Sequence, residues 1–230
     1  MKLSIIIPIL NEKHNIEKLI KLIFRSLKGL VYEIIFVDDN SQDGTFDLIK
    51  KIKNKKISFY VRKKKPNLTQ ACLLGISKAK YDYVVIMDGD LQHHPKYILK
   101  FIDAIKKKKI DIIVGIRDFS KRNHLSLIRY LGSKLLIFII NNFLGYKTLD
   151  PMSGYFLINK KIFKKYGVKM YGKGYKILFD IIYSASDKLI IKDIKIKFYK
   201  RFKDKSKMSI KILFHLIISF FLKLLNFSKI

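Results

Sequence analysis

The chain has 230 residues, enough for one well-packed core and a short appendage. Its 48 Lys and Arg against 18 Asp and Glu give a formal charge of +30, which favours anionic partners: phosphorylated substrates, anionic lipid or nucleic acid. An ordinary solvated surface explains each single lysine equally well. The lone cysteine, Cys72, excludes an intrachain disulfide, so the reducing side of a membrane is the default location.

Five short apolar runs predict buried strands, at residues 3–7, 32–37, 57–61, 82–87 and 110–116. Apolar residues at helical spacing separate these runs, over residues 16–27, 45–53, 68–79 and 98–105. This alternation is typical of an α/β protein with a mostly parallel sheet and helices on both faces. In such sheets, ligands bind beyond the carboxyl ends of the strands.

The second half of the chain predicts fewer clear elements. Residues 121–147 are basic and then strongly apolar, which favours either an amphipathic helix on the surface or a helix of the core. A helix is expected near residues 174–184, followed by a strand within residues 189–199. No internal repeat or Gly/Ser linker divides the chain, so we expect one globular domain over residues 1–207.

The C-terminal segment, residues 208–230, is apolar but interrupted by Lys211, His215 and Lys223. A helix that spans a membrane needs about 20 apolar residues, and the run between the two lysines is shorter. We therefore expect an amphipathic helix that lies in the membrane interface. A helix packed on the core is the alternative.

Polar side chains follow four of the predicted strands at their carboxyl ends. They are Asn11 and Glu12, then Asp38 and Asp39, then Asp88 and Asp90, and finally Arg117. Because the carboxyl ends of parallel strands meet at one edge of the sheet, we expect these side chains to share one site.

The stretch "YVVIMDGDLQHHP" places Asp88 and Asp90 directly after a buried strand. Two carboxylates at this spacing, with the Gln92 amide beside them, suit Mg²⁺ or Mn²⁺, which prefer oxygen ligands and share them with substrate phosphates. An ordinary Asp/Gly turn is the competing interpretation. His93 and His94 lack the cysteine partners of a zinc site, so we expect loop or helix-cap roles for them.

The second acidic pair lies in "FVDDNSQDGT". Asp39 follows a buried strand and can accept hydrogen bonds from a ribose or a base. Asp43 and Thr45 have the chemistry of a turn and a helix cap, so we interpret them as structural.

Six segments together resemble one known family: "SIIIPILNEKHNI", "EIIFVDDNSQDGT", "YVVIMDGDLQHHP", "IIVGIRD", "DPMSGYFLINKKIF" and "GYKILFDII". They resemble the inverting family-2 glycosyltransferases of the GT-A fold, and more narrowly the dolichol-phosphate mannosyltransferases, also called polyprenol monophosphomannose synthases. The resemblance covers residues 3–210 and implies a GT-A catalytic domain over residues 1–207. It also implies transfer of mannose from GDP-mannose to a polyprenyl (dolichyl-type) phosphate.

The resemblance also implies roles for individual residues. The nucleotide pocket would be lined by Pro8, Leu10, Glu12, Val37 and Asp39. The metal and the diphosphate would be held by Asp88, Asp90 and Gln92, with Gly89 close to the nucleotide sugar. The acceptor phosphate would be held by Arg117, Arg129 and Ser133, which with Asp90 form the implied catalytic centre. The phosphates would be covered by Arg201 and Lys207.

The implied acceptor agrees with the chemistry of these residues. A sugar hydroxyl needs a general base, whereas a phosphate is already an anion near neutral pH. Such a reaction needs positioning and charge balance, which arginine and a divalent cation supply. We therefore expect no side chain to act as an essential base.

The sequence departs from the resembled pattern after the third strand. Relatives carry a glycine-rich loop there, whereas "VRKKKPNLTQAC" has no glycine before Gly75. Gly89 stands where alanine is common, which is a small change. The first departure leaves the donor base open, and UDP-glucose is the alternative donor.

The apolar segments and the basic surface predict peripheral association with the cytoplasmic face of a membrane, with or without a short C-terminal anchor. A membrane-anchoring partner subunit is the other way to hold the chain there. A basic nucleic-acid-binding protein is the remaining alternative, but no recognised binding motif supports it. We expect no nucleic-acid partner.

Overall fold

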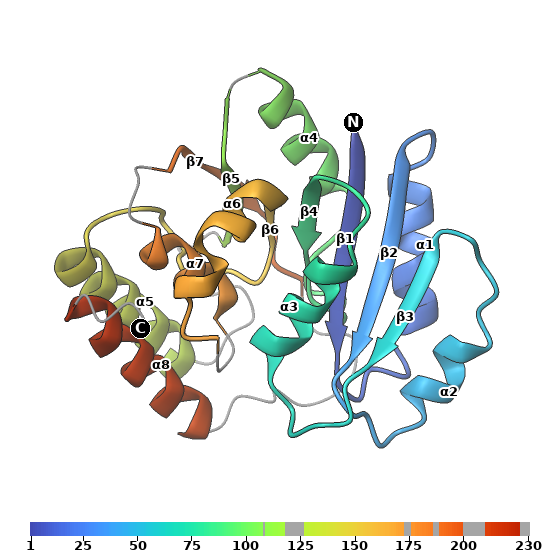
Figure 1. The fold of residues 1–230 in the computed structure, drawn as a ribbon, viewed down its shortest axis with the longest axis horizontal. Helices are drawn as coiled ribbons and strands as arrows, with labels where there is room; N and C mark the ends of the chain where they lie inside the picture. Colours follow the sequence, from blue (N-terminus) through green and yellow to red (C-terminus); the bar gives the residue numbers. More distant parts are fainter. Residues whose placement is uncertain (108, 118–126, 173–175, 186–188, 200–209, 226–230) are drawn as a thin grey trace.

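The computed structural model describes residues 1–107, 109–117, 127–172, 176–185, 189–199 and 210–225. Figure 1 shows a central sheet with helices on both sides and two further helices beside it. Within the described residues the sheet has seven strands in the order β3-β2-β1-β4-β6-β5-β7. Their bounds are β1 Lys2–Ile9, β2 Val31–Asp38, β3 Ile57–Val61, β4 Tyr83–Ile86, β5 Ile112–Arg117, β6 Phe156–Asn159 and β7 Ile191–Ile196.

The predicted mostly parallel sheet is confirmed. Strand β1 pairs in parallel with both β2 and β4, β2 pairs in parallel with β3, and β5 pairs in parallel with β7. Strand β6 differs, because it runs antiparallel between β4 and β5. The sequence analysis did not assign β6 as a strand, since its four residues carry too little periodicity to be separated from a loop.

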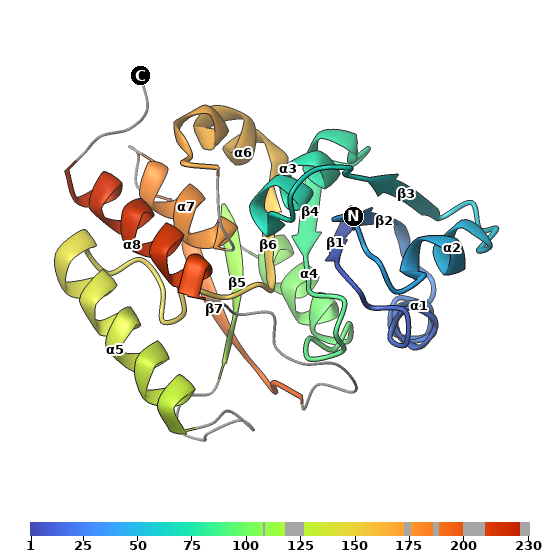
Figure 2. The same cartoon turned by 90° about the horizontal axis from the view of Figure 1, so that it is seen from below.

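Helices cover both faces of the sheet. One face carries α1 (Ile16–Ser26), α2 (Thr45–Lys50) and α4 (Tyr97–Lys107), and the other carries α3 (Leu68–Lys78), α6 (Lys160–Tyr166) and α7 (Ile177–Ser184) (Figure 2). A short 3-10 helix, Gly167–Lys169, follows α6. Cys72 lies on α3 and is buried in the core between this helix and the sheet.

The remaining helices, α5 (Leu127–Leu144) and α8 (Ile210–Leu224), lie side by side beyond α7 in both views (Figures 1 and 2). Their inner faces meet in a small core of Ile140, Met152 and Phe179, against which Phe220 packs. The two helices also expose large apolar side chains, namely Leu131, Leu135, Phe138 and Phe143 on α5 and Ile217, Phe221 and Leu224 on α8, and Leu225 directly after α8 is exposed as well. Among its described side chains, α8 packs on this core through Phe220 and exposes Ile217, Phe221 and Leu224, and its membrane-interface role stays a prediction.

No helix in the described part of the chain is long and apolar enough to cross a membrane.

Candidate active site

The strands bring the predicted polar residues to one edge of the sheet. Asp38 ends β2 and Arg117 ends β5, while Glu12 and Asp88 follow β1 and β4 by a few residues. Strands β1, β2, β4 and β5 all run in the same direction, so these four positions share the carboxyl edge. The common location expected from the sequence is confirmed for the described residues.

The loop after β4 presents two carboxylates in different surroundings. The Asp90 side chain is nearly buried, and its Oδ1 accepts a hydrogen bond from the Gln92 backbone N–H at 3.0 Å. The Asp88 carboxylate is more accessible, with a 35% exposed side chain. Between them and Gln92, Leu91 has a φ of 66°, in the left-handed region that bulky residues rarely adopt. The loop therefore holds the two carboxylates in a strained, specific conformation.

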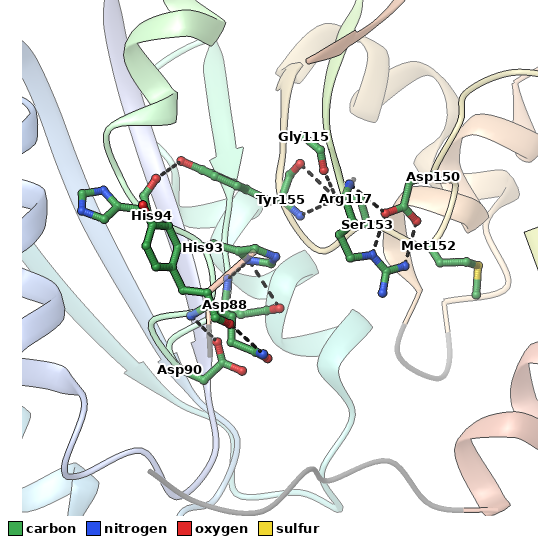
Figure 3. Close-up of polar contacts among 12 residues, drawn as sticks. Asp88, Asp90, His93, His94, Gly115, Arg117, Asp150, Met152, Ser153 and Tyr155 are labelled. Atoms are coloured by element: carbon green, nitrogen blue, oxygen red, sulfur yellow. Dashed lines mark hydrogen bonds and ion pairs between the residues drawn. The ribbon is translucent and has the colours of Figure 1, made fainter. Parts of the chain in front are cut away.

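His93 supports this loop from the side of the core, and its ring lies next to Asp88 (Figure 3). Its ring is 3% exposed and stacks on Tyr155 at 5.0 Å between ring centroids, with Phe198 at its edge. Its Nδ1 accepts a hydrogen bond from the Asp88 backbone N–H at 3.2 Å. Burial lowers the pKa of His93 to about 4, so the ring is neutral near pH 7 and can act as an acceptor. His93 therefore has the loop role expected from the sequence, whereas the burial of its ring against Tyr155 and Phe198 was not expected.

His94 behaves as the sequence predicted. Its Nδ1 accepts a hydrogen bond from the Lys96 backbone N–H at 3.1 Å, in the turn that precedes α4. The backbone carbonyl of His94 accepts a hydrogen bond from the Tyr155 hydroxyl at 3.1 Å. The two neighbouring histidines therefore brace the loop from different directions.

Gln92 links this loop to the segment after β7. The side-chain Nε2 of Gln92 donates to the backbone carbonyl of Tyr199 at 3.3 Å, and the backbone carbonyl of Gln92 accepts from the Tyr199 N–H at 3.1 Å. With the amide nitrogen used in this way, the amide oxygen is the atom that suits a cation. No group of three or more His, Cys, Asp or Glu among the described residues is arranged to hold a metal. Two carboxylates and one amide oxygen nevertheless fit a hard divalent ion that takes its other ligands from water or phosphate.

Gly154 lies directly against the Asp88 carboxylate. A Cβ at this position would stand 2.9 Å from Oδ2 and 3.1 Å from Oδ1 of Asp88. Any larger residue at position 154 would therefore displace the Asp88 carboxylate. The glycine of the "DPMSGYF" segment has a physical role that the sequence did not reveal.

Arg117 approaches from the other side of the site and is held by Asp150 (Figure 3). Its Nε and Nη2 donate to the two carboxylate oxygens of Asp150 at 2.8 and 3.0 Å, and the Asp150 side chain is 0% exposed. Burial would lower the pKa of Arg117, but the charge and hydrogen bonds of Asp150, with a contribution from Asp88, raise it. Arg117 is therefore a fixed, permanently charged donor facing the Asp88 side of the site.

The side of the site where a nucleotide pocket was predicted is organised around Asp39. Its carboxylate is buried and accepts from the Arg62 guanidinium and from the Asn67 backbone N–H. Asn67 in turn caps α3, because its side-chain oxygen accepts from the Gln70 N–H. These bonds fix the glycine-free loop between β3 and α3, so the loop is held by side chains.

The other predicted nucleotide residues differ in accessibility. Pro8 and Val37 are paired in register on β1 and β2 and are both buried, so any contact with a nucleotide would come from their main chain. Leu10 is half-buried at the end of β1. Glu12 is 6% exposed, and its Oε2 accepts from the Asn15 amide at 2.6 Å. Their assignment to a nucleotide pocket stays a prediction.

The structural interpretation of the neighbouring turn is supported by its contacts. Asp43 accepts from the backbone N–H groups of Lys13 and Thr45 at 3.0 and 2.9 Å. The Thr45 hydroxyl accepts from the Glu12 N–H at 3.0 Å. The turn thus joins the loops after β1 and β2.

The four remaining predicted residues are only partly located. Ser133 is half-buried on α5, one turn before Ile137, on the face that packs inward. Arg129 lies in the first turn of α5, four residues earlier, so its backbone position is on the same face. Arg201 and Lys207 lie outside the described residues.

Several residues that build this site were not assigned from the sequence. They are Arg62, Asn67, His93, Asp150 and Gly154. Asp150 and Gly154 lie in a segment that was used only as a resemblance, and their partners are far away in the chain. The available signals in the sequence were the aspartate of "DPMSG" and the arginine that follows a predicted strand.

Comparisons with known proteins agree with this arrangement. The model of glycosyl transferase family 2 matches residues 4–167. A dolichol-phosphate mannosyltransferase of Pyrococcus furiosus is 35% identical over 219 residues, which are 93% of this chain and 61% of the relative. One of Saccharomyces cerevisiae is 28% identical over 229 residues, 91% of this chain and 82% of the relative. The chain thus spans less than two thirds of the Pyrococcus relative.

Solved structures of glucosyl-3-phosphoglycerate synthase from Mycobacterium tuberculosis share the fold. One in complex with phosphoglyceric acid has a TM-score of 0.73 at 18% identity and covers 99% of this chain and 80% of that one. Another, with Mn²⁺, UDP and glucosyl-3-phosphoglycerate, has a TM-score of 0.72 at 19% identity, with coverage of 99% and 80%. The expected GT-A fold is confirmed. With this fold, the matched residues and the acidic edge of its sheet, the chain belongs to glycosyl transferase family 2 and resembles the dolichol-phosphate mannosyltransferases.

Proposed function

We propose that this glycosyltransferase transfers mannose from GDP-mannose to a polyprenyl phosphate, with inversion at the anomeric carbon. The observation that carries the proposal is the similarity to dolichol-phosphate mannosyltransferases across 93% of the chain. The geometry supports it, because acidic side chains and a fixed arginine face each other at the carboxyl edge of the sheet.

The reaction balances without a base from the protein. An oxygen of the acceptor phosphate forms a bond to the anomeric carbon of mannose while the bond from that carbon to the diphosphate breaks. The electron pair leaves with GDP, and the acceptor oxygen carries no proton to remove near neutral pH. The protein therefore contributes orientation and charge balance.

The carboxylates of Asp88 and Asp90 and the amide oxygen of Gln92 would hold Mg²⁺ or Mn²⁺. When bound, such a cation neutralises the diphosphate leaving group. The chain fixes the ligands through His93 beneath Asp88 and through the Gln92 N–H that binds Asp90. These two supports would set the ligand geometry before substrate arrives.

Arg117 would hold the acceptor phosphate. A bidentate pair with Asp150 fixes the plane of its guanidinium, so little entropy is lost when it binds a second anion. Arg129 and Ser133 would contribute from the inner face of α5, and Arg201 and Lys207 would cover the phosphates from the loop after β7.

A second donor, UDP-glucose, is favoured by the fold neighbours. Glucosyl-3-phosphoglycerate synthase has been solved with UDP-glucose and Mn²⁺ at a TM-score of 0.73 and 18% identity. Arg62 and Asp39 shape the base side of the pocket here without a glycine-rich loop. The mechanism would be the same with either donor, whereas the base and sugar contacts would differ.

The outer faces of α5 and α8 would place the enzyme on a membrane surface, where its acceptor resides. Both helices expose apolar side chains on this side, including Leu135, Phe138 and Phe221. A chain with a formal charge of +30 is also attracted to anionic lipid. An anchoring partner subunit would act on the same side. Flotation with anionic vesicles tests this, and no difference between wild type and L135E/F138E would contradict it.

The function is tested by supplying the purified protein with polyprenyl phosphate in vesicles and either labelled GDP-mannose or UDP-glucose. The expected product is lipid-linked mannose that disappears on addition of a chelator. If lipid-linked glucose forms instead, the donor is UDP-glucose and not GDP-mannose. If neither donor gives a lipid-linked product, the assignment of polyprenyl phosphate as the acceptor is wrong.

A further inference from the structure

Lys176 precedes α7 and reaches the segment that carries Asp150. Its Nζ donates to the Met152 carbonyl at 3.2 Å, and the side chain is half-buried. Met152 lies two residues after Asp150, the carboxylate that holds Arg117. The Lys176 ammonium therefore contacts the same segment whose Asp150 carboxylate holds Arg117.

Within the described part of the chain, no carboxylate lies within ion-pair distance of Lys176 Nζ, and the Met152 carbonyl is its hydrogen-bond partner. Burial and the nearby charge of Arg117 lower the pKa of Lys176, while Asp150 and Asp88 oppose this. An ammonium has three donors and costs free energy to bury without a counter-charge. The group is thus placed to receive an anion.

We propose that Lys176 binds the phosphate of the acceptor substrate together with Arg117. The inference rests on the proposed function, which supplies a phosphomonoester acceptor. It adds Lys176, the residue directly before α7, to the acceptor-binding residues proposed on β5 and α5.

The order of the strands places this anion on the acceptor side. The nucleotide residues Asp39 and Arg62 follow β2 and β3, and the cation ligands follow β4 in the middle of the sheet. Arg117 ends β5, beyond β6, where Asp150 pairs with it and Lys176 binds the Met152 carbonyl two residues from Asp150. An anion between Lys176 and Arg117 therefore lies across the cation ligands from the base pocket, where an attacking group must stand.

Two cations at this place also have a chemical reason. Asp150 already neutralises Arg117, so the pair alone presents little net charge to a dianionic phosphate. Lys176 restores one positive charge. Both substrates are anions, and their phosphates must approach each other before transfer, so this charge lowers their repulsion.

The test compares Lys176→Met and Lys176→Arg with Lys160→Met. Lys160 is the matched control, because its Nζ also donates to a backbone carbonyl, that of Ala79, away from the site. Calorimetry measures binding of farnesyl phosphate in the absence of donor, with farnesol as the uncharged probe. Steady-state assays with saturating donor give the KM for polyprenyl phosphate, and assays with saturating acceptor give the KM for GDP-mannose.

Lys176→Met is expected to weaken farnesyl phosphate binding and raise the acceptor KM by about tenfold to a hundredfold, the range for a charge-assisted hydrogen bond. Farnesol binding and the donor KM stay within about twofold. Lys176→Arg keeps the charge and recovers most of the affinity, and Lys160→Met behaves as wild type.

Three results would overturn the inference. A rise in the donor KM alone would place Lys176 on the donor diphosphate. Equal losses for farnesyl phosphate and farnesol would show a structural role, as would a loss that Lys176→Arg does not recover. If the wild type binds farnesyl phosphate but transfers no mannose, the proposed function fails, and the binding comparison still decides the role of Lys176.

Discussion

Lys223 of α8 and Asp180 of α7 form a buried ion pair, with 3.0 Å between Nζ and Oδ1 and side chains that are 6% and 4% exposed. Nζ also donates to the Ser184 hydroxyl, and the Asp180 carboxylate accepts from the backbone N–H groups of Tyr171 and Gly172. The lysine that interrupts the apolar C-terminal segment is therefore a docking residue. It fixes α8 to the catalytic fold and leaves the opposite helix face exposed.

Lys223→Met is expected to destabilise the protein by about 3–5 kcal/mol, because it leaves the Asp180 carboxylate buried without its cation. Urea unfolding gives the free energy. Lys164→Met, on the exposed face of α6, is the control and should change it by less than about 0.5 kcal/mol. An unchanged midpoint for Lys223→Met would show that α8 is not docked by this pair.

Asp90→Asn is expected to reduce transfer on the order of a thousandfold, since the cation loses one charged ligand. The amide oxygen can still accept the Gln92 N–H, so the loop should keep its shape. The measurement is transfer rate against Mn²⁺ concentration. Asp103→Asn, exposed on α4, should match wild type. Full activity of Asp90→Asn with the same metal dependence would remove Asp90 from the site.

Gly154→Ala tests the space beside Asp88. The new Cβ would displace the Asp88 carboxylate, so metal affinity is expected to fall by about tenfold to a hundredfold, as when support for a metal ligand is lost. Gly132→Ala is the control, because nothing lies within 4 Å of its Cβ on α5. It should raise stability by up to about 1 kcal/mol and leave metal affinity unchanged. Equal metal affinity in both variants would contradict the role of Gly154.

Asp150→Asn removes the counter-charge of Arg117 in a buried position. We expect a loss of about 3–5 kcal/mol of stability from the broken pair. We also expect a higher acceptor KM, because the guanidinium loses its fixed orientation. Asp111→Asn is the control, since Asp111 accepts a backbone N–H from Ile190 at 2.8 Å but pairs with no arginine among the described residues. If folded Asp150→Asn has an unchanged acceptor KM, the orientation of Arg117 by Asp150 does not contribute to acceptor binding.

The Asp43 turn predicts part of the acid dependence of stability. Partial burial would raise the pKa of Asp43, but hydrogen bonds from Thr45 and Lys13 lower it below its ordinary value. A carboxylate with a lowered folded-state pKa stabilises the fold above its unfolded pKa, and this contribution is lost as pH falls through the folded pKa.

The difference in unfolding free energy between wild type and Asp43→Asn should therefore shrink as the pH falls from about 7 to about 3. Denaturant unfolding at a series of pH values measures it. Asp47→Asn, exposed on α2 directly after this turn, should show no such trend. A constant difference for Asp43→Asn would contradict the lowered pKa.

Much of the fold was predictable because its signals are local. Apolar runs marked β1, β2, β3, β4 and β5 within a few residues, and the direction of parallel strands then placed Asp88 and Arg117 at one edge. Strand β6 was not predictable, because an antiparallel insertion between β4 and β5 depends on distant partners. The burial of the His93 ring was not predictable for the same reason, since Tyr155 and Phe198 enclose it from far along the chain.

The sequence by itself determined the class of fold, the acidic loop after the fourth strand and the family, because these depend on residue order and on short-range periodicity. Only the tertiary structure decided which charges are neutralised. It paired Arg117 with Asp150, Asp39 with Arg62 and Lys223 with Asp180, and left Lys176 without a carboxylate among the described residues. Charge pairing depends on distances between side chains, and folding sets those distances between residues far apart in the chain.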